Sequence, residues 1–376
     1  MFRSARIRLI VVIAIAVLAS SCANRLATDT ASNSAPQETT TTTTTTSLVA
    51  EPEATAEPDV DPSAPTDTAS AQPATDIAPV FAEPTFDVRV TTDIVYAQAL
   101  SHNGWGSETA EPIDLLLDVY EPVRTDDVTM PAVVMIHGGG FTGGSKEHGA
   151  LSSMAHWFAE RGWVAYSINY RLAGDTGTLP AEYPQPPIAV PQEQADQWRA
   201  LYPACRDAKA AIRWVKATAD DFSIDPDHVA VVGGSAGSNL AITLGVSDEG
   251  DCTDEVSIDD DPTLASTNLD QSSSVATVID HWGGSAVLTM LGFLDSGSRF
   301  DPTDAPVSIV HGTADTTVDF AEAENLRSAY ESTGVPYAWH PLEGAGHAAW
   351  RATIDGRPLV ESAADFIIET QRLDVR

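Results

Sequence analysis

The sequence predicts an α/β fold, with a mostly parallel, doubly wound sheet, helices on both faces and a small lid or insertion region. Two observations carry this prediction. Five short apolar runs, bounded by Gly, Pro or Asp, have the length and composition of strands that are buried on both faces. Segments with helical periodicity separate these runs. Because ligands bind at the carboxyl ends of the strands in such sheets, candidate functional residues should directly follow the runs.

The expected strands are of two kinds. At the start of the domain, apolar and polar residues alternate from Val88 to Tyr96 and from Leu115 to Val119, which predicts half-buried, antiparallel strands at a sheet edge. A further strand is expected at residues 337–342. The continuous apolar runs of the central sheet are residues 132–136, 163–168, 229–232, 275–279 and 307–310.

The clearest helix is predicted at residues 205–219. Its alanines, Ile212 and Val215 share one face, so the four basic residues on the other face are expected to point into solvent. These basic residues are Arg206, Lys209, Arg213 and Lys216. Further helices are predicted at residues 149–161, 236–246, 321–333 and 363–372.

The N-terminal residues indicate export. Residues 1–21 contain three arginines, an apolar run too short to cross a membrane, and small residues before Cys22, which is the plan of a secretory signal peptide. The segment resembles a bacterial lipoprotein signal, which implies cleavage before Cys22 and lipidation of that cysteine. Plain secretion and a retained anchor are the alternatives. We therefore expect an exported protein, either a cell-surface lipoprotein or a secreted one.

Residues 22–80 are predicted to form a disordered linker. No aromatic residue lies between Phe2 and Phe81, and Thr, Ala, Ser, Pro, Asp and Glu dominate the segment, so it offers too little apolar surface to fold. Its threonine run and repeated prolines suit an extended tether, while a tail without a spacing role is the alternative. Residues 81–376 then remain as one large domain with a single core.

The charge of the chain limits its partners. It carries 20 basic and 54 acidic residues, a formal net charge of −34. Such a surface repels phosphate backbones, which excludes nucleic acid as a partner, and it disfavours electrostatic docking on anionic lipids. Membrane contact is therefore expected only through a lipid on Cys22, and uncharged small molecules remain compatible as ligands. The composition does not predict an oligomeric state.

The cysteines suggest a disulfide. If Cys22 carries a lipid, Cys205 and Cys252 remain as an even pair in an oxidising compartment. Two separate free thiols are the alternative, because the sequence does not show whether the two Cα atoms come within bonding range. A zinc site is disfavoured, because neither cysteine has a Cys or His neighbour at ligand spacing.

A serine turn follows one of the apolar runs. Residues 233–237 read Gly-Gly-Ser-Ala-Gly, between a predicted strand and a predicted helix. A serine on a sharp strand-to-helix turn needs small neighbours, and its hydroxyl is exposed at the helix N-terminus. Ser235 is therefore the candidate nucleophile, with a purely structural glycine turn as the alternative.

A glycine loop follows another run. Residues 137–141 read His-Gly-Gly-Gly-Phe, and successive glycines let backbone N–H groups face a cavity, where they can stabilise an oxyanion. A phosphate-binding loop is disfavoured, because the lysine and Ser/Thr of a P-loop are missing. We expect His137 to brace the loop rather than to take part in chemistry.

Two further residues complete a catalytic set. Asp315 follows the run at 307–310, where a carboxylate can orient a histidine and stabilise its cation. Asp319 competes for this role, but we interpret it as the N-cap of the next helix. His347 follows the strand at 337–342 in a loop of small residues, so it is free to reach a serine.

The order of these motifs, glycine loop, serine, aspartate and histidine, is that of an α/β-hydrolase. From about Phe86 to Arg376 the chain resembles esterases of the HGGG type. It is similar to hormone-sensitive-lipase-like esterases and to bacterial feruloyl and acetyl-xylan esterase-like enzymes. The resemblance implies an α/β-hydrolase fold for the domain, with Ser235 as nucleophile, His347 as general base and acid, and Asp315 as its orienting carboxylate.

The resemblance also implies an oxyanion hole and a reaction. The N–H groups of Gly139, Gly140 and Ala236 would hold the oxyanion while the serine attacks an ester carbonyl and the histidine takes its proton. The alcohol leaves, and water then hydrolyses the acyl-enzyme. No metal or organic cofactor is needed for this cycle. The expected substrates are short-chain esters or carbohydrate-linked esters of the feruloyl or acetyl type.

Other functions use the same residues differently. A serine peptidase or amidase of this fold would share the triad, and only turnover of amides against esters separates the two. A non-catalytic cell-surface binding protein is a third possibility, but it normally goes with a broken triad. A long-chain lipase is disfavoured because no extended apolar lid is evident.

Two segments depart from a minimal hydrolase. Residues 248–261 contain eight acidic residues where such folds often place a lid. We interpret them as a solvated acidic loop, with a calcium site as the alternative. Residues 174–198 are rich in proline, and we expect Tyr183 and Trp198 to shape the pocket wall there.

Overall fold

The computed structural model describes residues 77–186 and 189–376. The predicted signal segment, Cys22 and the linker as far as residue 76 lie outside the described residues. Within the described ranges, no helix has both the length and the apolar character needed to cross a membrane.

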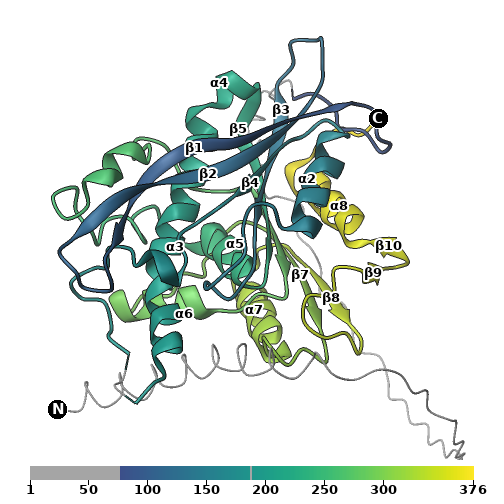
Figure 1. The fold of residues 1–376 in the computed structure, drawn as a ribbon. Helices are drawn as coiled ribbons and strands as arrows, with labels where there is room; N and C mark the ends of the chain where they lie inside the picture. Colours follow the sequence, from purple (N-terminus) through teal and green to yellow (C-terminus); the bar gives the residue numbers. More distant parts are fainter. Residues whose placement is uncertain (1–76, 187–188) are drawn as a thin grey trace, which may run out of the picture. The chain divides into compact units, whose positions relative to one another are not determined.

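One sheet runs through the domain (Figure 1). Its order is β1-β2-β4-β3-β5-β6-β7-β8, in which β1, β2 and β4 pair antiparallel and all pairs from β4 to β8 are parallel. The predicted antiparallel edge and parallel centre are both confirmed. The strands are β1 (Val88–His102), β2 (Ala110–Pro122), β3 (Met130–Ile136), β4 (Val164–Ile168), β5 (Ile224–Gly234), β6 (Thr277–His281), β7 (Val307–Gly312) and β8 (Tyr337–Leu342).

Helices cover both faces of the sheet, as predicted (Figure 1). One face packs against α2 and α8, and the other packs against α3, α5, α6 and α7. Along β3, Val134 and Ile136 point into one core while Val133 and Met135 point into the other, which is why the strand is apolar throughout. The helices are α2 (Gly149–Ala159), α3 (Gln192–Ala217), α4 (Ala219–Phe222), α5 (Ala236–Val246), α6 (Ala286–Leu294), α7 (Phe320–Thr333) and α8 (Leu359–Gln371).

Three elements differ from their prediction. Helix α3 begins at Gln192 rather than at residue 205 and runs through Pro203, so it takes in the end of the proline-rich segment. Helix α6 was not predicted, because its residues are apolar without a clear helical period. In β1 the alternation is interrupted by register shifts, and the neighbours Tyr96 and Ala97 are both buried.

The folded domain also begins earlier than predicted. Ile77 forms a bridge with Thr129, and Val80 forms one with Val375 and is fully buried. The prediction of a disordered linker up to residue 80 is therefore wrong for residues 77–80. The apolar side chains of Ile77, Ala78 and Val80 gain enough burial to hold this part of the chain on the domain.

Candidate active site

Ser235 lies on the turn between β5 and α5, and steric limits explain that turn. Its backbone is in an unfavourable left-handed region, with φ 56° and ψ −119°. A Cβ on Gly233 would lie 2.4 Å from the carbonyl oxygen of Gly237, and one on Gly237 would lie 2.0 Å from that of Ile136. Only glycine fits at both positions, so the chain turns sharply and presents the serine above the sheet.

The structure brings the three predicted side chains together. The Nε2 atom of His347 lies 2.9 Å from Oγ of Ser235, and its Nδ1 atom lies 2.7 Å from Oδ2 of Asp315. Asp319 instead caps α7, where its carboxylate accepts a hydrogen bond from the N–H of Ala321 at 2.9 Å. The choice of Asp315 over Asp319 is therefore consistent with the geometry.

The surroundings of Asp315 keep it ionised. Its Oδ1 atom accepts hydrogen bonds from the N–H groups of Thr317 and Val318, at 2.8 and 3.0 Å. Burial alone would raise the pKa of the Asp315 carboxyl, but hydrogen bonds from His311, His347 and the backbone outweigh burial and lower this pKa well below its usual range. A permanent carboxylate therefore faces His347.

Sequence reasoning assigned no role to His311 and Asp280, which lie beneath the triad. Both are fully buried, and the Nε2 atom of His311 lies 3.0 Å from the carbonyl oxygen of Val318 and 3.4 Å from Oδ2 of Asp315. Nδ1 of His311 and Oδ2 of Asp280 have no hydrogen-bond partner among the described residues. Their position at the carboxyl ends of β6 and β7 was a signal that could have found them.

The glycine loop packs directly against the serine turn. A Cβ on Gly138 would lie 2.7 Å from the carbonyl oxygen of Gly234, and Gly139 adopts φ +125°. His137 stacks on Tyr170 with ring centroids 4.3 Å apart, and its Nδ1 atom lies 2.8 Å from the carbonyl oxygen of Gly138. Burial lowers the pKa of His137 to about 4, so the ring is neutral. These contacts agree with a bracing role.

A cavity lies beside Ser235, with about 370 Å³ of atom-free space including its open mouth. Gly140 and Ala236 border it, whereas Gly139 and His347 do not. Among the described residues, no acceptor contacts the backbone N–H of Gly140. Further lining residues are Phe141, Gln197, Asn239, Gly284, Ser285, Ala286 and Val318.

The proline-rich segment contributes a different residue from those predicted. Gln197 lines the cavity and donates a hydrogen bond from Nε2 to the carbonyl oxygen of Gly140 at 2.6 Å. Tyr183 and Trp198 are buried in the core instead, and Trp198 packs edge-on against Phe293. The prediction that these two rings shape the pocket wall is wrong, because Trp198 on α3 faces the core and Tyr183 packs against it, donating a hydrogen bond to its carbonyl oxygen at 2.5 Å.

A family model described as BD-FAE matches residues 117–184 and 193–296. The matched residues include the glycine loop and Ser235, while Asp315 and His347 lie beyond them. The matched segments make up slightly less than half of the chain. This finding, with the chain order of the motifs, confirms the predicted resemblance to esterase-type α/β-hydrolases.

Two curated proteins of Mycobacterium tuberculosis are similar to this chain. Esterase LipQ is 25% identical over 284 residues, which cover 67% of this chain and 58% of LipQ. Carboxylesterase NlhH is 32% identical over 133 residues, which cover 35% of this chain and 33% of NlhH. The chain therefore spans less than two thirds of the length of these relatives.

Solved structures are similar to this chain in fold. An esterase from Thermogutta terrifontis with bound propionate aligns with a TM-score of 0.53 and 23% identity, over 77% of this chain and 96% of that one. The butyrate-bound form of that enzyme aligns with a TM-score of 0.54. These likenesses confirm the α/β-hydrolase fold.

The prediction of a solvated acidic loop holds only in part. Exposed acidic residues are Asp248, Glu249, Asp254, Asp259 and Asp260, whereas Asp251 and Asp261 are buried. The α5–β6 segment (residues 247–276) contains the acidic residues that were expected to form a solvated loop, but it lies on the basic face of α3. Arg206 forms a buried ion pair with Asp261, N–O 3.2 Å, and Arg213 donates to the carbonyl oxygen of Thr267 at 2.9 Å. The Arg206, Lys209 and Arg213 side chains are consequently buried rather than solvated.

The burial of Lys209 on α3 changes the pKa of its ammonium group. Its ammonium group donates to the carbonyl oxygens of Asp248 and Glu249, the latter at 3.3 Å. Burial lowers the pKa of Lys209 to about 8. The acidic residues of the segment therefore compensate cations on α3 as well as facing solvent.

A disulfide joins the same two elements. Cys205 on α3 and Cys252 on the α5–β6 segment are bonded, with their Cα atoms 6.0 Å apart. This is the predicted pair. Among residues 77–186 and 189–376, no three His, Cys, Asp or Glu side chains group in a way that could hold a metal ion.

Proposed function

We propose that the protein is a serine hydrolase that cleaves carboxylic esters. The observation that carries this proposal is the chain of contacts from Ser235 through His347 to Asp315, beside a cavity bordered by Gly140 and Ala236. The names of the relatives LipQ and NlhH, an esterase and a carboxylesterase, support the same reaction class.

The proposed cycle uses each contact in turn. His347 accepts the Oγ proton through Nε2 as Ser235 attacks the ester carbonyl, and the carboxylate of Asp315 stabilises the imidazolium. The N–H groups of the glycine loop and Ala236 stabilise the negative charge on the carbonyl oxygen. His347 then returns its proton to the leaving alcohol, and a water molecule, activated by the same nitrogen, hydrolyses the acyl-enzyme.

The exposure of His347 suggests which half of the ester is large. Its side chain is 19% exposed, while Asp315 behind it is fully buried. Because the alcohol must leave next to Nε2, the alcohol departs on the side that is open to solvent. A bulky alcohol such as a carbohydrate fits this arrangement, so carbohydrate-linked esters are included in the proposal.

A substrate panel tests the reaction class. Purified protein should react covalently with a fluorophosphonate at Ser235, and it should hydrolyse p-nitrophenyl acetate, feruloyl esters and acetylated xylan much faster than the matching p-nitroanilides. Labelling at Ser235 combined with faster anilide turnover would favour a peptidase or amidase. Absence of both labelling and turnover in folded protein would contradict a hydrolase altogether.

We also propose that the protein is exported and lipidated at Cys22. The disulfide between Cys205 and Cys252 supports an oxidising compartment, because such bonds are rare in reducing cytosol. Intact-mass analysis of the membrane fraction should show a diacylglycerol adduct on a chain that starts at Cys22. An unmodified chain starting elsewhere would contradict lipidation.

A further inference from the structure

Two fully buried histidines lie at the carboxyl ends of neighbouring strands, and their surroundings differ. His281 ends β6, and Nδ1 of its ring lies 3.2 Å from the carbonyl oxygen of Gly233. His311 lies on β7, and Nε2 of its ring lies 3.0 Å from the carbonyl oxygen of Val318 and 3.4 Å from Oδ2 of Asp315. Of these two rings, only that of His311 contacts a carboxylate of the described residues.

The register of β6 and β7 brings a second carboxyl group to the side of His311. Asp280 is paired with Ile309, and His311 lies two residues farther along β7, so Asp280 and His311 point to the same face of the sheet. The Oδ1 atom of Asp280 accepts a hydrogen bond from the N–H of Gly283 at 2.8 Å, which fixes the carboxyl group. Its Oδ2 atom and Nδ1 of His311 have no hydrogen-bond partner among the described residues.

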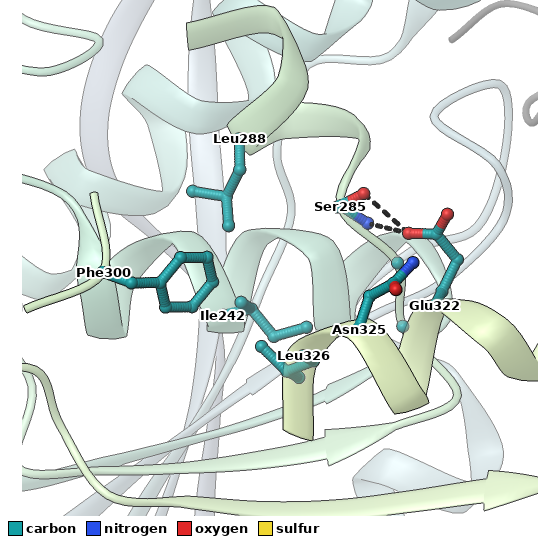
Figure 2. A pocket seen from close by; sticks show the side chains of 9 residues that line it. Ile242, Ser285, Leu288, Phe300, Glu322, Asn325 and Leu326 are labelled. Carbon is teal, nitrogen blue, oxygen red and sulfur yellow. Dashed lines mark hydrogen bonds between the residues drawn. The ribbon is translucent and has the colours of Figure 1, made fainter. Parts of the chain in front are cut away.

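The other elements that pack against His311 add no further charge within the described part of the chain. From α7, Phe320 presents its ring, with the two ring centroids 5.9 Å apart. On β8 the register partner of His311 is Pro341. The Oε2 atom of Glu322, farther along α7, is engaged elsewhere, because it accepts hydrogen bonds from the N–H and Oγ of Ser285 at 3.0 and 2.6 Å (Figure 2).

The two buried histidines consequently differ in charge. Burial lowers the pKa of His281 to about 4, and its contact with Gly233 offsets this only in part, so the ring is neutral. Burial also opposes protonation of His311, but the hydrogen bond with Asp315 and the charge of Asp280 outweigh burial and raise the pKa of this ring. Burial raises the pKa of the Asp280 carboxyl as well, so Asp280 and His311 hold one proton between them. The ionised Asp315 draws this proton to the ring.

We propose that His311 is a positioning residue that holds a positive charge behind Asp315 and so weakens the pull of this carboxylate on a proton at His347. Asp280 is the counter-charge that keeps the cation in its buried site. The Asp315 carboxylate is then shared by two histidines, one on the side of Ser235 and one behind it. The enzyme therefore keeps its general base unprotonated, and stays active, to a lower pH than it would with His347 alone on this carboxylate. The inference rests on the proposed function.

The pH profile of His311→Gln is the first test. Glutamine can still donate from Nε2 to the carbonyl oxygen of Val318, but it carries no charge. The acidic limb of the kcat/KM profile on p-nitrophenyl acetate should therefore move to higher pH by about 0.5–1 unit, as expected for one charge that acts across an intervening carboxylate. A merely structural role would lower kcat/KM by the same factor at every pH. An acidic limb that stays in place in folded His311→Gln would overturn the proposal.

His281→Gln is the matched control, because it replaces the buried histidine that is neutral. It should leave the acidic limb in place, even where the lost contact with Gly233 lowers the rate. A shift equal to that of His311→Gln would show that the limb responds to any change in this buried layer, and it would overturn the proposal.

Asp280→Asn tests the counter-charge and keeps the test decisive if His311→Gln does not fold. Asparagine retains an oxygen that can accept from the N–H of Gly283, but it removes the negative charge that keeps His311 protonated. The acidic limb should therefore move to higher pH, by less than in His311→Gln. A limb that stays in place or moves to lower pH in folded Asp280→Asn would overturn the role of Asp280.

The charge of His311 can also be measured in the wild-type protein. The chain has nine histidines, and ¹⁵N NMR of protein labelled on the histidine side chains separates rings with two protons from rings with one. As the pH rises, the ring of His311 should be the last to lose its second proton, and its signal should be missing from the spectrum of His311→Gln. A neutral His311 ring at pH 6 would overturn this inference alone, provided that fluorophosphonate still labels Ser235. A wild type without labelling and without ester turnover would overturn the proposed reaction itself.

Discussion

Two parts of the domain are held in place by different forces. The turn around Ser235 is fixed by backbone atoms in close contact, where a Cβ on Gly233 or Gly237 would collide with a carbonyl group. The α5–β6 segment is fixed by side chains that reach it from α3, through an ion pair, hydrogen bonds to carbonyl oxygens and a disulfide. The first region is fixed by glycines that touch backbone, either within the turn or on the neighbouring strand β3, and the second depends on side chains of a distant helix.

This difference separates activity from stability. Changes at the catalytic turn and its partners should remove chemistry and leave the fold, because Ser235 and His347 face a cavity or solvent. Changes at the α5–β6 segment should weaken the fold and affect chemistry less, because its contacts lie on the outer side of α3. Four experiments test this separation, and they follow in order of expected effect.

The largest effect is expected at the triad. Ser235→Ala should lower kcat/KM by about 10⁶-fold and His347→Ala by nearly as much, while Asp315→Asn should cost about 10⁴-fold because it permits the wrong histidine tautomer. Steady-state ester kinetics on folded variants measure these losses, with urea unfolding as the check on the fold. A folded Ser235→Ala variant that keeps a tenth of the wild-type kcat/KM would mean that the turnover arises elsewhere.

The buried ion pair comes next. Asp261→Asn leaves the Arg206 guanidinium buried without a counter-charge, so the free energy of unfolding should fall by about 3–5 kcal/mol. Asp365→Asn removes one partner of Arg357 at the surface and should change it by less than about 1 kcal/mol. Urea unfolding of both variants gives the comparison. Equal losses in the two would show that the α3 pair is as solvated as the surface pair.

The disulfide should contribute slightly less. Cys205 and Cys252 are 47 residues apart, and closing a loop of that size stabilises a protein by roughly 3–4 kcal/mol through chain entropy. The double variant Cys205→Ser/Cys252→Ser should lose this amount in urea unfolding while keeping most of its esterase activity. Reductant should bring wild type to the same midpoint as the variant. If reductant has no effect on wild type, the bond is not formed in solution.

The smallest effect is a pH dependence at Glu249. Burial opposes ionisation, but hydrogen bonds from Ser272 and Ser273 outweigh it and lower the pKa of the Glu249 carboxyl to about 2, against an ordinary value of 4.5. The folded state therefore favours the carboxylate, and this stabilisation is present above pH 4.5 and lost as the pH falls to about 2. Wild type should melt a few degrees above Glu249→Gln at pH 6, and the gap should close toward pH 2. A gap that stays constant over this range would contradict the assignment.

The turn at Ser235 could be predicted because its Gly-x-Ser-x-Gly pattern stands between an apolar run and a helical segment. Gly233 is required by a contact with Gly237, while Gly237 is required by a contact with Ile136 at the end of β3. Ser235, Asp315 and His347 each follow a predicted strand. The parallel sheet could likewise be predicted from the sequence, since strands buried on both faces are apolar throughout. His311 and Asp280 also directly follow apolar runs, which marks them as candidates, but the sequence does not show that their side chains lie next to Asp315.

The contacts of the α5–β6 segment were not predicted, because they are made with α3, which is distant in sequence. Arg206, Lys209 and Arg213 occupy the polar face of an amphipathic helix, and on an isolated helix such a face is solvated. The acidic residues from 248 onward, taken alone, are likewise typical of a solvated loop. Only the tertiary structure shows that the segment covers the basic face of α3, through Asp261 and through backbone carbonyl oxygens. The same holds for Gln197, whose contact with Gly140 joins residues far apart in the chain.

The bridge between Ile77 and Thr129 fixes the edge of the sheet at which the chain enters the domain. Thr129 directly precedes β3, so the chain enters the domain at the amino ends of the parallel strands. Ser235, Asp315 and His347 all follow the carboxyl ends, at the opposite edge of the sheet. A support coupled directly at residue 77 would therefore lie behind the domain. Immobilised in this way, the protein presents its catalytic edge outward, where large polymeric substrates can reach it.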